Sequence, residues 1–341
     1  MSMKKPITIS IHQVAKEAGV SIKTVSRVIN NHPDVAPATR QRVQEVIDQL
    51  DYRPNASAQG LRARQTNTIA FIILHYQTSS MFAEAFLANI IAGIIDSLVP
   101  QDYHLLIYPV PDGDENRLRT LFNSRRVDGV IVQQGYPNDP MISLIADAHI
   151  PVAYIGLDEA PHTGSVNVTT DFAVGTRLAV RHLVERGHRH IGHIRGDVSW
   201  SSGAVRVSAF KDELLRQQLL LREDWICGEG WSRQHGAEAM QQLLNLPERP
   251  TGIVAACDML AIGAMEVIRS HGLRIPEDIA LVGFDDIFSA GDLFAPLTTI
   301  RTSFYDFGKE AAANLLRLLN APDSPPQQII LPCELIIRKS T

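Results

Sequence analysis

The stretch VSIKTVSRVIN, residues 20–30, gathers hydrogen-bonding side chains at helical spacing. Lys23 and Arg27 stand one helical turn apart, and both can donate to guanine edges or to phosphates. The hydroxyl and amide side chains around them suit phosphate oxygens, and Ile22 suits a thymine methyl group. The candidate nucleic-acid contacts are Ser21, Ile22, Lys23, Thr24, Ser26, Arg27 and Asn30.

A short helix is needed to present these side chains, and the sequence predicts one inside a group of three. A first helix is expected over 11–18, and Gly19 supplies the turn that follows it. Ser21 can cap a second helix over 22–29, and apolar spacing predicts a third helix over 38–50. A helix, a glycine turn and a serine-capped short helix are typical of the helix-turn-helix arrangement. A three-helix bundle without a role in DNA binding is the alternative.

The charge of the chain is divided unevenly. Residues 1–66 carry ten Lys and Arg against five Asp and Glu, whereas the rest of the chain carries 22 against 32. A small basic unit joined to a large acidic one indicates that only the first part meets a polyanion.

From Thr68 onwards, short apolar segments alternate with amphipathic helices. The strand candidates are 69–74, 104–110, 127–134, 151–156, 190–196, 252–257 and 279–284. Such alternation predicts an α/β fold with parallel sheets covered on both faces. These strands are more than one compact sheet needs, so we expect two doubly wound lobes that divide near residue 160. A ligand cleft is then expected between the carboxyl ends of the strands of the two lobes.

Polar side chains stand at the ends of the expected strands. Gln133 closes one strand, Asp158 follows another, and Asp285 follows the apolar run ALVGF. A carboxylate can accept from two sugar hydroxyls, and an arginine such as Arg206 can donate to several acceptors. A structural alternative exists for each: Asp285 can cap a turn, and Arg206 can pair with an acid on a helix.

Two segments resemble the DNA-binding headpiece of the lactose repressor family of bacterial transcription regulators. They read VAKEAGVSIKTVSRVIN (14–30) and TRQRVQEVIDQLDYRPN (39–55). The resemblance continues through RVDGVIV, HLVERGHRHIGHIRG, GLRIPEDIALVGFDD and PLTTIR, and therefore covers nearly the whole chain.

The resemblance implies how the chain is divided. It implies a headpiece over 1–52, a hinge helix or linker over 53–66, and an effector-binding and dimerisation core over 67–341. The core is similar to periplasmic sugar-binding proteins. Its expected segments are 67–160 and 293–327 for lobe one, and 161–292 and 328–341 for lobe two.

The resemblance also implies which side chains contact the effector. Four residues align with family positions that contact it: Gln133, Asp158, Arg206 and Asp285. Trp231 matches an indole that packs on the sugar in the family, and its flat face suits the C–H face of a pyranose. The full candidate set is Phe82, Gln133, Asp158, Asp171, Arg206, Trp231, Cys257, Asp258 and Asp285.

Cys257 departs from the family pattern. It stands where many sugar-binding relatives have Asn, and a thiol is a poorer hydrogen-bond partner than an amide. The cleft is therefore expected to recognise different hydroxyls, or to depend more on Asp258 and Arg206. A carbohydrate or sugar derivative is the expected effector, and a purine-like ligand acting as a corepressor is the alternative.

The segment YRPNASAQGLRAR, residues 52–64, is expected to be helical only on DNA. A helix of two turns that contains a glycine is marginal in water. By resemblance, Leu61 would wedge a base step in the minor groove, with Arg62 near phosphates. The candidate DNA contacts in this segment are Asn55, Ala58, Leu61 and Arg62.

Other patterns limit the class of protein. The longest apolar runs fall far short of the ~18 residues of a membrane span, and no signal peptide is expected. Three scattered cysteines favour the reducing cytoplasm, where a DNA-binding protein would associate with the nucleoid. The histidines of GHRHIGH have no acid or cysteine at ligand spacing, so neither a metal nor a cofactor is expected.

These patterns together predict a ligand-responsive DNA-binding regulator, a repressor released by a sugar, without enzymatic activity. A homodimer would place two headpieces on the half-sites of a pseudo-palindromic, double-stranded operator. A two-lobed solute-binding protein is the alternative from another class, since a fold alone does not fix a function.

Overall fold

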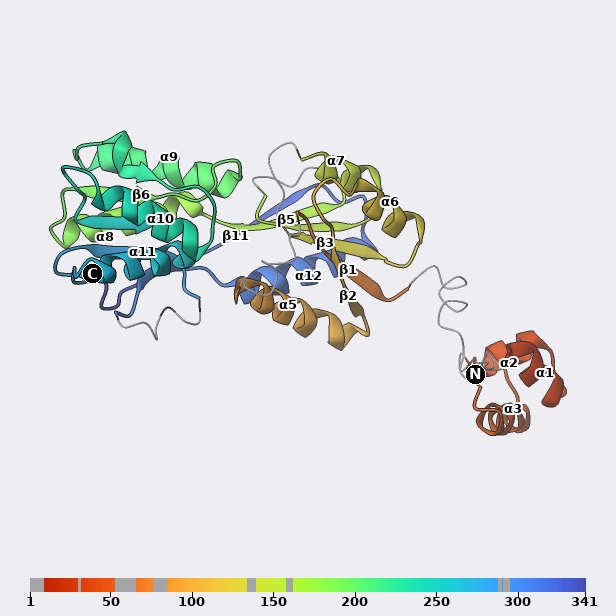
Figure 1. The fold of residues 1–341 in the computed structure, drawn as a ribbon. Helices are drawn as coiled ribbons and strands as arrows, with labels where there is room; N and C mark the ends of the chain where they lie inside the picture. Colours follow the sequence, from red (N-terminus) through yellow and green to blue (C-terminus); the bar gives the residue numbers. More distant parts are fainter. Residues whose placement is uncertain are drawn as a thin grey trace, which may run out of the picture. The chain divides into compact units, whose positions relative to one another are not determined.

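The computed structural model describes residues 9–29, 32–52, 66–75, 85–133, 139–157, 162–287 and 295–341, together with Ala290. The chain forms two compact units, Met1–Thr66 and Asn67–Thr341 (Figure 1). Each unit has a hydrophobic core of its own.

Among its described residues, the smaller unit, which we call the headpiece, contains three short helices. They are α1 (Ile11–Glu17), α2 (Ile22–Ile29) and α3 (Pro37–Gln49). Gly19 makes the turn between α1 and α2 at a φ of 61°, a conformation that glycine adopts without strain. Val14, Val25 and Val43, one from each helix, are completely buried and form the centre of the core.

The larger unit contains two six-stranded sheets, and the first defines lobe one. Its strand order is β11-β5-β4-β3-β1-β2, with all neighbours parallel. The strands are β1 (Thr68–Ile73), β2 (His104–Pro109), β3 (Gly129–Gln133), β4 (Val152–Ile155), β5 (Ser165–Thr170) and β11 (Gln327–Leu331). The helices are α5 (Ala85–Leu98), η1 (Val99–Gln101), α6 (Glu115–Asn123), α7 (Pro140–Asp147) and α12 (Phe304–Asn320). Figure 1 shows α5 and α12 on one face of the sheet and α6 and α7 on the other.

The second sheet defines lobe two, with the order β12-β10-β9-β8-β6-β7. Its strands are β6 (Ile191–Ile194), β7 (Ile226–Cys227), β8 (Gly252–Ala255), β9 (Ala280–Asp285), β10 (Thr298–Arg301) and β12 (Glu334–Ile336). Its helices are α8 (Phe172–Glu185), α9 (Ser201–Arg216), η2 (Glu223–Trp225), α10 (Arg233–Leu244) and α11 (Asp258–Ser270). One core packs α8 and α9 against the sheet, and a second core packs α10 and α11.

The chain passes between the lobes at three places. It leaves β5 for α8 at Asp171, leaves β10 for α12 at residues 302–303, and leaves β11 for β12 at residues 332–333. We call these segments the three crossings. Each follows directly on the carboxyl end of a strand, which is the edge of a parallel sheet where ligands bind.

The lobe boundaries expected at 160, 293 and 328 are wrong. Strands β5 and β11 pair with each other in the sheet of lobe one, whereas β10 lies in the sheet of lobe two. Lobe one therefore keeps the chain as far as the first crossing. The sequence of strand β5 is SVNVTT, which contains polar residues and no apolar run, although all six residues are buried.

The fold class is as predicted: a small helical headpiece and a two-lobed α/β core with doubly wound sheets. One pair departs from the parallel pattern, since β12 lies antiparallel to β10. No helix among the described residues is long and apolar enough to cross a membrane.

Candidate functional site

Helix α2 begins at a serine cap. The backbone N–H of Thr24 donates to Oγ of Ser21 at 3.1 Å, and the two hydroxyls lie 2.9 Å apart. Such a cap satisfies a helix N–H that would otherwise lack a partner. Val25 and Val28 then fix the buried face of α2 in the headpiece core.

The outer face of α2 carries the predicted DNA contacts. Lys23 and Arg27 are exposed, whereas Thr24 and Ser26 are half-buried. Ile22 is half-buried too and packs against the headpiece core, so only part of its side chain is left for a base methyl group. The arrangement presents two cations on one exposed edge of a short helix, as major-groove recognition requires.

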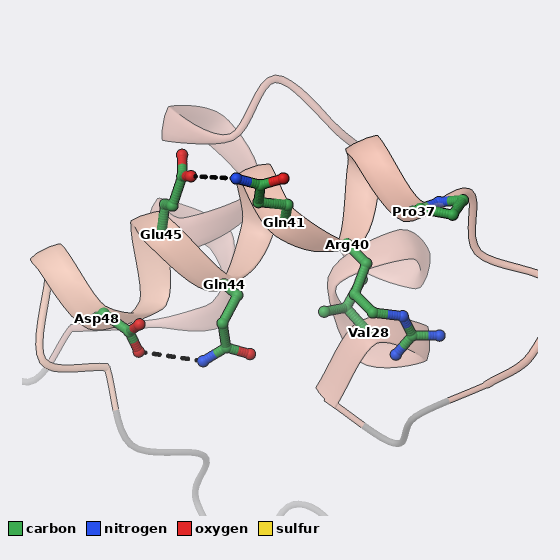
Figure 2. A pocket seen from close by; sticks show the side chains of 7 residues that line it. All are labelled: Val28, Pro37, Arg40, Gln41, Gln44, Glu45 and Asp48. Atoms are coloured by element: carbon green, nitrogen blue, oxygen red, sulfur yellow. Dashed lines mark hydrogen bonds between the residues drawn. The ribbon is translucent and has the colours of Figure 1, made fainter.

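A groove of about 580 Å³ in the headpiece lies between α2 and α3 (Figure 2). Its lining residues are Val28, Pro37, Arg40, Gln41, Gln44, Glu45 and Asp48. The amide of Gln41 donates to Glu45 at 3.1 Å, and the amide of Gln44 donates to Asp48 at 3.0 Å. Two carboxylates on this face of α3 make it a poor site for phosphates.

Several predicted site residues lie outside the described residues. These are Asn30, Asn55, Ala58, Leu61 and Arg62 among the DNA contacts, and Phe82 and Asp158 among the effector contacts.

In lobe two, the structure brings Arg206 of α9 and Asp285 of β9 together. Nη2 of Arg206 lies 4.0 Å from Oδ1 of Asp285, and Arg206 is only 4% exposed. Nη1 donates to the carbonyl of Ser202 at 3.3 Å. Nε is buried without a hydrogen-bond partner in the described part of the chain. A buried guanidinium with one unused donor is suited to an acceptor that a ligand supplies.

Aromatic rings hold the guanidinium of Arg206 in place. Its central carbon lies 4.2 Å from the ring centre of Phe172, 4.4 Å from that of Phe284 and 5.5 Å from that of Trp231. Cation–π contacts of this kind stabilise a charge that has lost its water. The Trp231 ring packs on Gly196, where a Cβ would lie 2.2 Å from the indole carbon Cη2. A side chain larger than glycine at 196 would displace the indole.

Burial shifts the proton equilibria of this pair. It raises the pKa of Asp285 to about 7, although the charge of Arg206 acts in the opposite direction. Burial also lowers the pKa of Arg206. Asp285 lies at a φ of 110°, an unusual backbone conformation for a residue with a side chain. A strained, half-buried carboxyl beside a charge partner is typical of a functional site.

The side chains of Asp258 and Cys257 form hydrogen bonds to other residues of lobe two. Oδ1 of Asp258 accepts from the hydroxyl of Thr299 at 2.6 Å, and Oδ2 accepts from the N–H of Ile287 at 2.9 Å. Burial and the nearby carboxyl of Asp285 hold the pKa of Asp258 well above its usual range. The thiol of Cys257 donates to the carbonyl of Trp231 at 3.7 Å, and burial raises its pKa. Both side chains thus brace the segments that carry Trp231 and Asp285.

Two further candidates lie at strand ends of lobe one. Gln133 is the last residue of β3, and its Oε1 is buried without a hydrogen-bond partner among the described residues. Asp171 lies at the first crossing and caps α8, because its Oδ1 accepts from the N–H of Val174 at 2.8 Å. The structure leaves Asp171 exposed and does not bring it into contact with Arg206.

Sequence reasoning missed two residues of the site. Phe172 and Phe284 pack on Arg206, and each is the chain neighbour of an aspartate that was selected. A second cluster was also missed: His75, which follows β1, bonds Asp112 and Asp139 and lies edge-on to Trp200 of lobe two. No motif links these positions in the sequence.

Two family models match this chain. Residues 10–55 match the model of bacterial regulatory proteins of the lacI family, and residues 180–341 match that of a periplasmic binding protein-like domain. The chain is 31% identical to the transcriptional regulator CelR of Thermobifida fusca, with 97% of this chain and 98% of that protein covered. It is 32% identical to the transcriptional repressor PurR of Haemophilus influenzae, with 97% and 98% covered.

Solved structures agree with these matches. The lac repressor dimer bound to operator and an anti-inducer superposes with a TM-score of 0.84 at 29% identity, and 99% of each chain is covered. A complex of CelR with cellobiose superposes with a TM-score of 0.75 at 30% identity, covering 98% of this chain and all of that one. Identity of at least 30% over nearly the full length of curated relatives identifies the family. The chain belongs to the lacI family of bacterial regulatory proteins and is a DNA-binding transcription regulator.

Proposed function

We propose that this regulator is a repressor released from its operator by a neutral carbohydrate that binds at the strand ends of both lobes, with Arg206 and Asp285 of lobe two as its main contacts. The observation that carries the proposal is the Arg206–Asp285 pair, 4.0 Å apart, in which Nε of the buried Arg206 has no hydrogen-bond partner among the described residues. The guanidinium donates to sugar oxygens, and the carboxylate accepts from sugar hydroxyls.

The charges of the pair favour a neutral ligand over an acidic one. Arg206 offers one positive charge, but the carboxylate of Asp285 stands beside it and would repel a ligand carboxylate. Trp231 supplies a flat apolar surface for the C–H face of a sugar ring. A solved relative, CelR, is described in complex with cellobiose, which is a neutral sugar of this kind.

The other selected cleft residues are proposed to complete the site. Gln133 has a buried acceptor without a partner among the described residues, so it is suited to a ligand hydroxyl. Asp258 and Cys257 act by bracing the site, as their internal bonds indicate. Effector contacts are also proposed at Phe82, Asp158 and Asp171.

We further propose a homodimer that forms through lobe one. The strand β2 is an edge strand of its sheet, and its Leu106 and Ile107 are exposed. Ile95 of α5 and Val99 of η1 are also exposed apolar residues. An uncovered apolar edge strand favours pairing with another chain, and a second copy is the partner that a two-fold operator requires. The lac repressor structure that resembles this chain is itself described as a dimer.

In such a dimer, two copies of α2 would read the half-sites of a pseudo-palindromic operator, with Asn30 among the contacts. The linker residues Asn55, Ala58, Leu61 and Arg62 would contact the minor groove between the half-sites. The protein would act in the cytoplasm, on the nucleoid, and without enzymatic activity, as its relatives are transcription regulators.

A ligand screen tests the proposed function. Thermal unfolding of the full chain is followed with cellobiose, glucose, galactose, a sugar acid, hypoxanthine and guanine. The proposal expects a neutral sugar to raise the melting temperature, because a ligand that binds only the folded state stabilises it. Stabilisation by a nucleobase alone would overturn the proposed sugar and favour a purine-like corepressor in its place.

A further inference from the structure

Asp286 directly follows Asp285, and two arginines engage its carboxylate. Nε of Arg301 donates to Oδ2 at 2.7 Å, and Nη2 of Arg338 donates to Oδ1 at 2.6 Å. The side chain of Asp286 is only 9% exposed. Both oxygens of this largely buried carboxylate thus accept charge-assisted hydrogen bonds, which are stronger than bonds between neutral groups.

The two arginines belong to segments that meet the crossings. Arg301 is the last residue of β10, and the chain then enters lobe one through the second crossing. Arg338 lies just after β12, the strand that begins where the third crossing returns to lobe two. Nη1 of Arg301 also donates to Glu334, the first residue of β12, at 2.8 Å. One carboxylate is therefore bonded to both segments that join the lobes at this side of the sheet.

The same place carries unusual backbone conformations. Asp285 has a φ of 110° and Asp286 a φ of 57°, and neither is a glycine. Asp285 pairs with Arg301 in the register of β9 and β10, and its carbonyl accepts from the N–H of Thr302 at 3.4 Å, a long bond. A conformation of this kind persists only where neighbouring contacts enforce it. The two bonds of Asp286 are contacts of this kind, directly next to Asp285 in the chain.

We propose that Asp286 is a positioning residue, which holds Asp285 in its effector-binding conformation and couples it to the second and third crossings. This inference rests on the proposed function of the Arg206–Asp285 site. Movement of one lobe against the other changes the direction of the crossings, and Arg301 and Arg338 transmit that change to Asp286. Because the coupling is reciprocal, a ligand on Asp285 biases the arrangement of the lobes.

The matched variants are Asp286→Asn, Asp286→Glu and Glu334→Gln in the full chain. The first removes the charge that both arginines bind. The second keeps the carboxylate, and the third removes the other partner of Arg301 without touching Asp286. Hydrogen exchange is measured at the amides of Ile287 and Thr302, which bond Asp258 and Asp285.

We expect Asp286→Asn to speed exchange at these two amides by about tenfold, with Asp286→Glu restoring protection to within about threefold. Glu334→Gln is expected to change the exchange rates of these two amides by less than about twofold. If Asp286→Asn does not fold, Arg301→Gln replaces it, and exchange is expected to rise in the same direction beyond the effect of Glu334→Gln. Unchanged exchange in the Asp286 variant, or an equal effect of Glu334→Gln, would overturn the proposal.

A binding measurement separates this inference from the proposed function. Cellobiose is titrated into the wild-type protein. If the thermal screen identifies a different neutral sugar, that sugar is used instead of cellobiose. Asp286→Asn is expected to bind that sugar at least about tenfold more weakly, since a displaced carboxylate loses charge-assisted hydrogen bonds. If no sugar binds the wild type, the proposed function fails and the exchange data alone decide the role of Asp286. If the variant binds as tightly as the wild type, only the role of Asp286 fails.

Discussion

The carboxyl of Asp285 lies 4.0 Å from Nη2 of Arg206 inside lobe two, at the carboxyl end of β9. Phe172, Phe284 and Trp231 pack around the guanidinium. The pair is not a close ion pair, and Nε of Arg206 has no hydrogen-bond partner in the part of the chain that the structure describes. This geometry is the basis on which the pair is proposed to bind polar groups of a ligand.

Arg206→Met is expected to weaken binding of the stabilising sugar by about 10- to 100-fold, because a hydrogen bond to a charged group contributes ~1.5–3 kcal/mol. Operator binding in the absence of the sugar should stay close to that of the wild type, since Arg206 is not in the headpiece. Calorimetric titration of the sugar measures the first effect. Arg216→Met, on the same helix but exposed, is the control and should bind normally. Equal weakening in both variants would show that the effect comes from α9 as a whole.

The affinity for the sugar is expected to rise with pH through about 7. Burial raises the pKa of Asp285 to about 7, so the acid is largely protonated at pH 6 and largely ionised at pH 8. Only the ionised carboxylate of Asp285 can accept charge-assisted hydrogen bonds from two sugar hydroxyls. The affinity for the sugar therefore rises as Asp285 loses its proton. Titrations at pH 6, 7 and 8 measure the trend, and Asp285→Asn should abolish it. A wild-type affinity that falls over this range would contradict the assigned role.

The raised pKa of Asp285 has the opposite effect on the stability of the fold, which it lowers as pH rises. A carboxyl whose pKa is raised in the folded state holds its proton more tightly there than in the unfolded chain. Its contribution to stability is therefore greatest at low pH and declines as pH rises from about 3.8 towards 7. Comparing the melting temperature of Asp285→Asn with that of the wild type across this range isolates the contribution. A difference that does not change with pH would refute it.

His75 is a second titratable group, besides Asp285, that should make the stability of the fold depend on pH. Burial lowers the pKa of His75, but the hydrogen bonds to Asp139, at 2.5 Å, and to Asp112 outweigh it and raise the pKa above 6.5. Two carboxylates on opposite ring nitrogens require both nitrogens to donate, as only the protonated ring can. This stabilisation is fully present below pH 6.5 and is lost as pH rises through the raised value.

Melting temperatures between pH 6 and pH 9 measure the effect of His75. His75→Gln should lose the part of the pH dependence that the wild type shows above pH 6.5. Asp112→Asn removes the exposed partner but keeps Asp139, so it should retain an intermediate dependence. Identical profiles for His75→Gln and the wild type would mean that the ring is neutral throughout.

Lys23→Gln and Arg27→Gln are each expected to weaken operator binding by ~1–3 kcal/mol, because each side chain is exposed on the outer face of α2. Lys16→Gln, at an exposed position of α1, is the control for the loss of one positive charge and should have a smaller effect. Fluorescence anisotropy with labelled promoter DNA at two salt concentrations measures binding. If Lys16→Gln loses as much affinity for the operator as the α2 variants, the proposal that α2 binds in the major groove is contradicted.

The fold was predictable where a pattern in the chain was local. The three helices of the headpiece follow from capping residues and apolar spacing, and the buried strands of the core follow from runs such as TIAFII. The strand β5 could not be found in this way, because SVNVTT is polar and is buried only by its neighbours β4 and β11. Lobe boundaries depend on such strands and were therefore misplaced.

The candidate site was predictable in part. Arg206, Trp231 and Asp285 were selected from strand ends and from the family resemblance, and the structure brings these three together. The packing of Phe172 and Phe284 on Arg206 is a tertiary contact that no spacing in the sequence encodes. The internal bonds of Asp258 and Cys257 likewise depend on partners distant in the chain, Thr299 and Trp231.

Release of the operator by a sugar can be measured directly on bound DNA. DNA from upstream of the protein's own gene is bound by the wild type and by Arg206→Met, and the neutral sugar that stabilises the wild type is then titrated in. We expect both proteins to bind the DNA, the sugar to release the wild type, and Arg206→Met to stay bound at the same concentrations. Release of both proteins at the same sugar concentration, or a tighter wild-type complex in the presence of the sugar, would contradict this expectation.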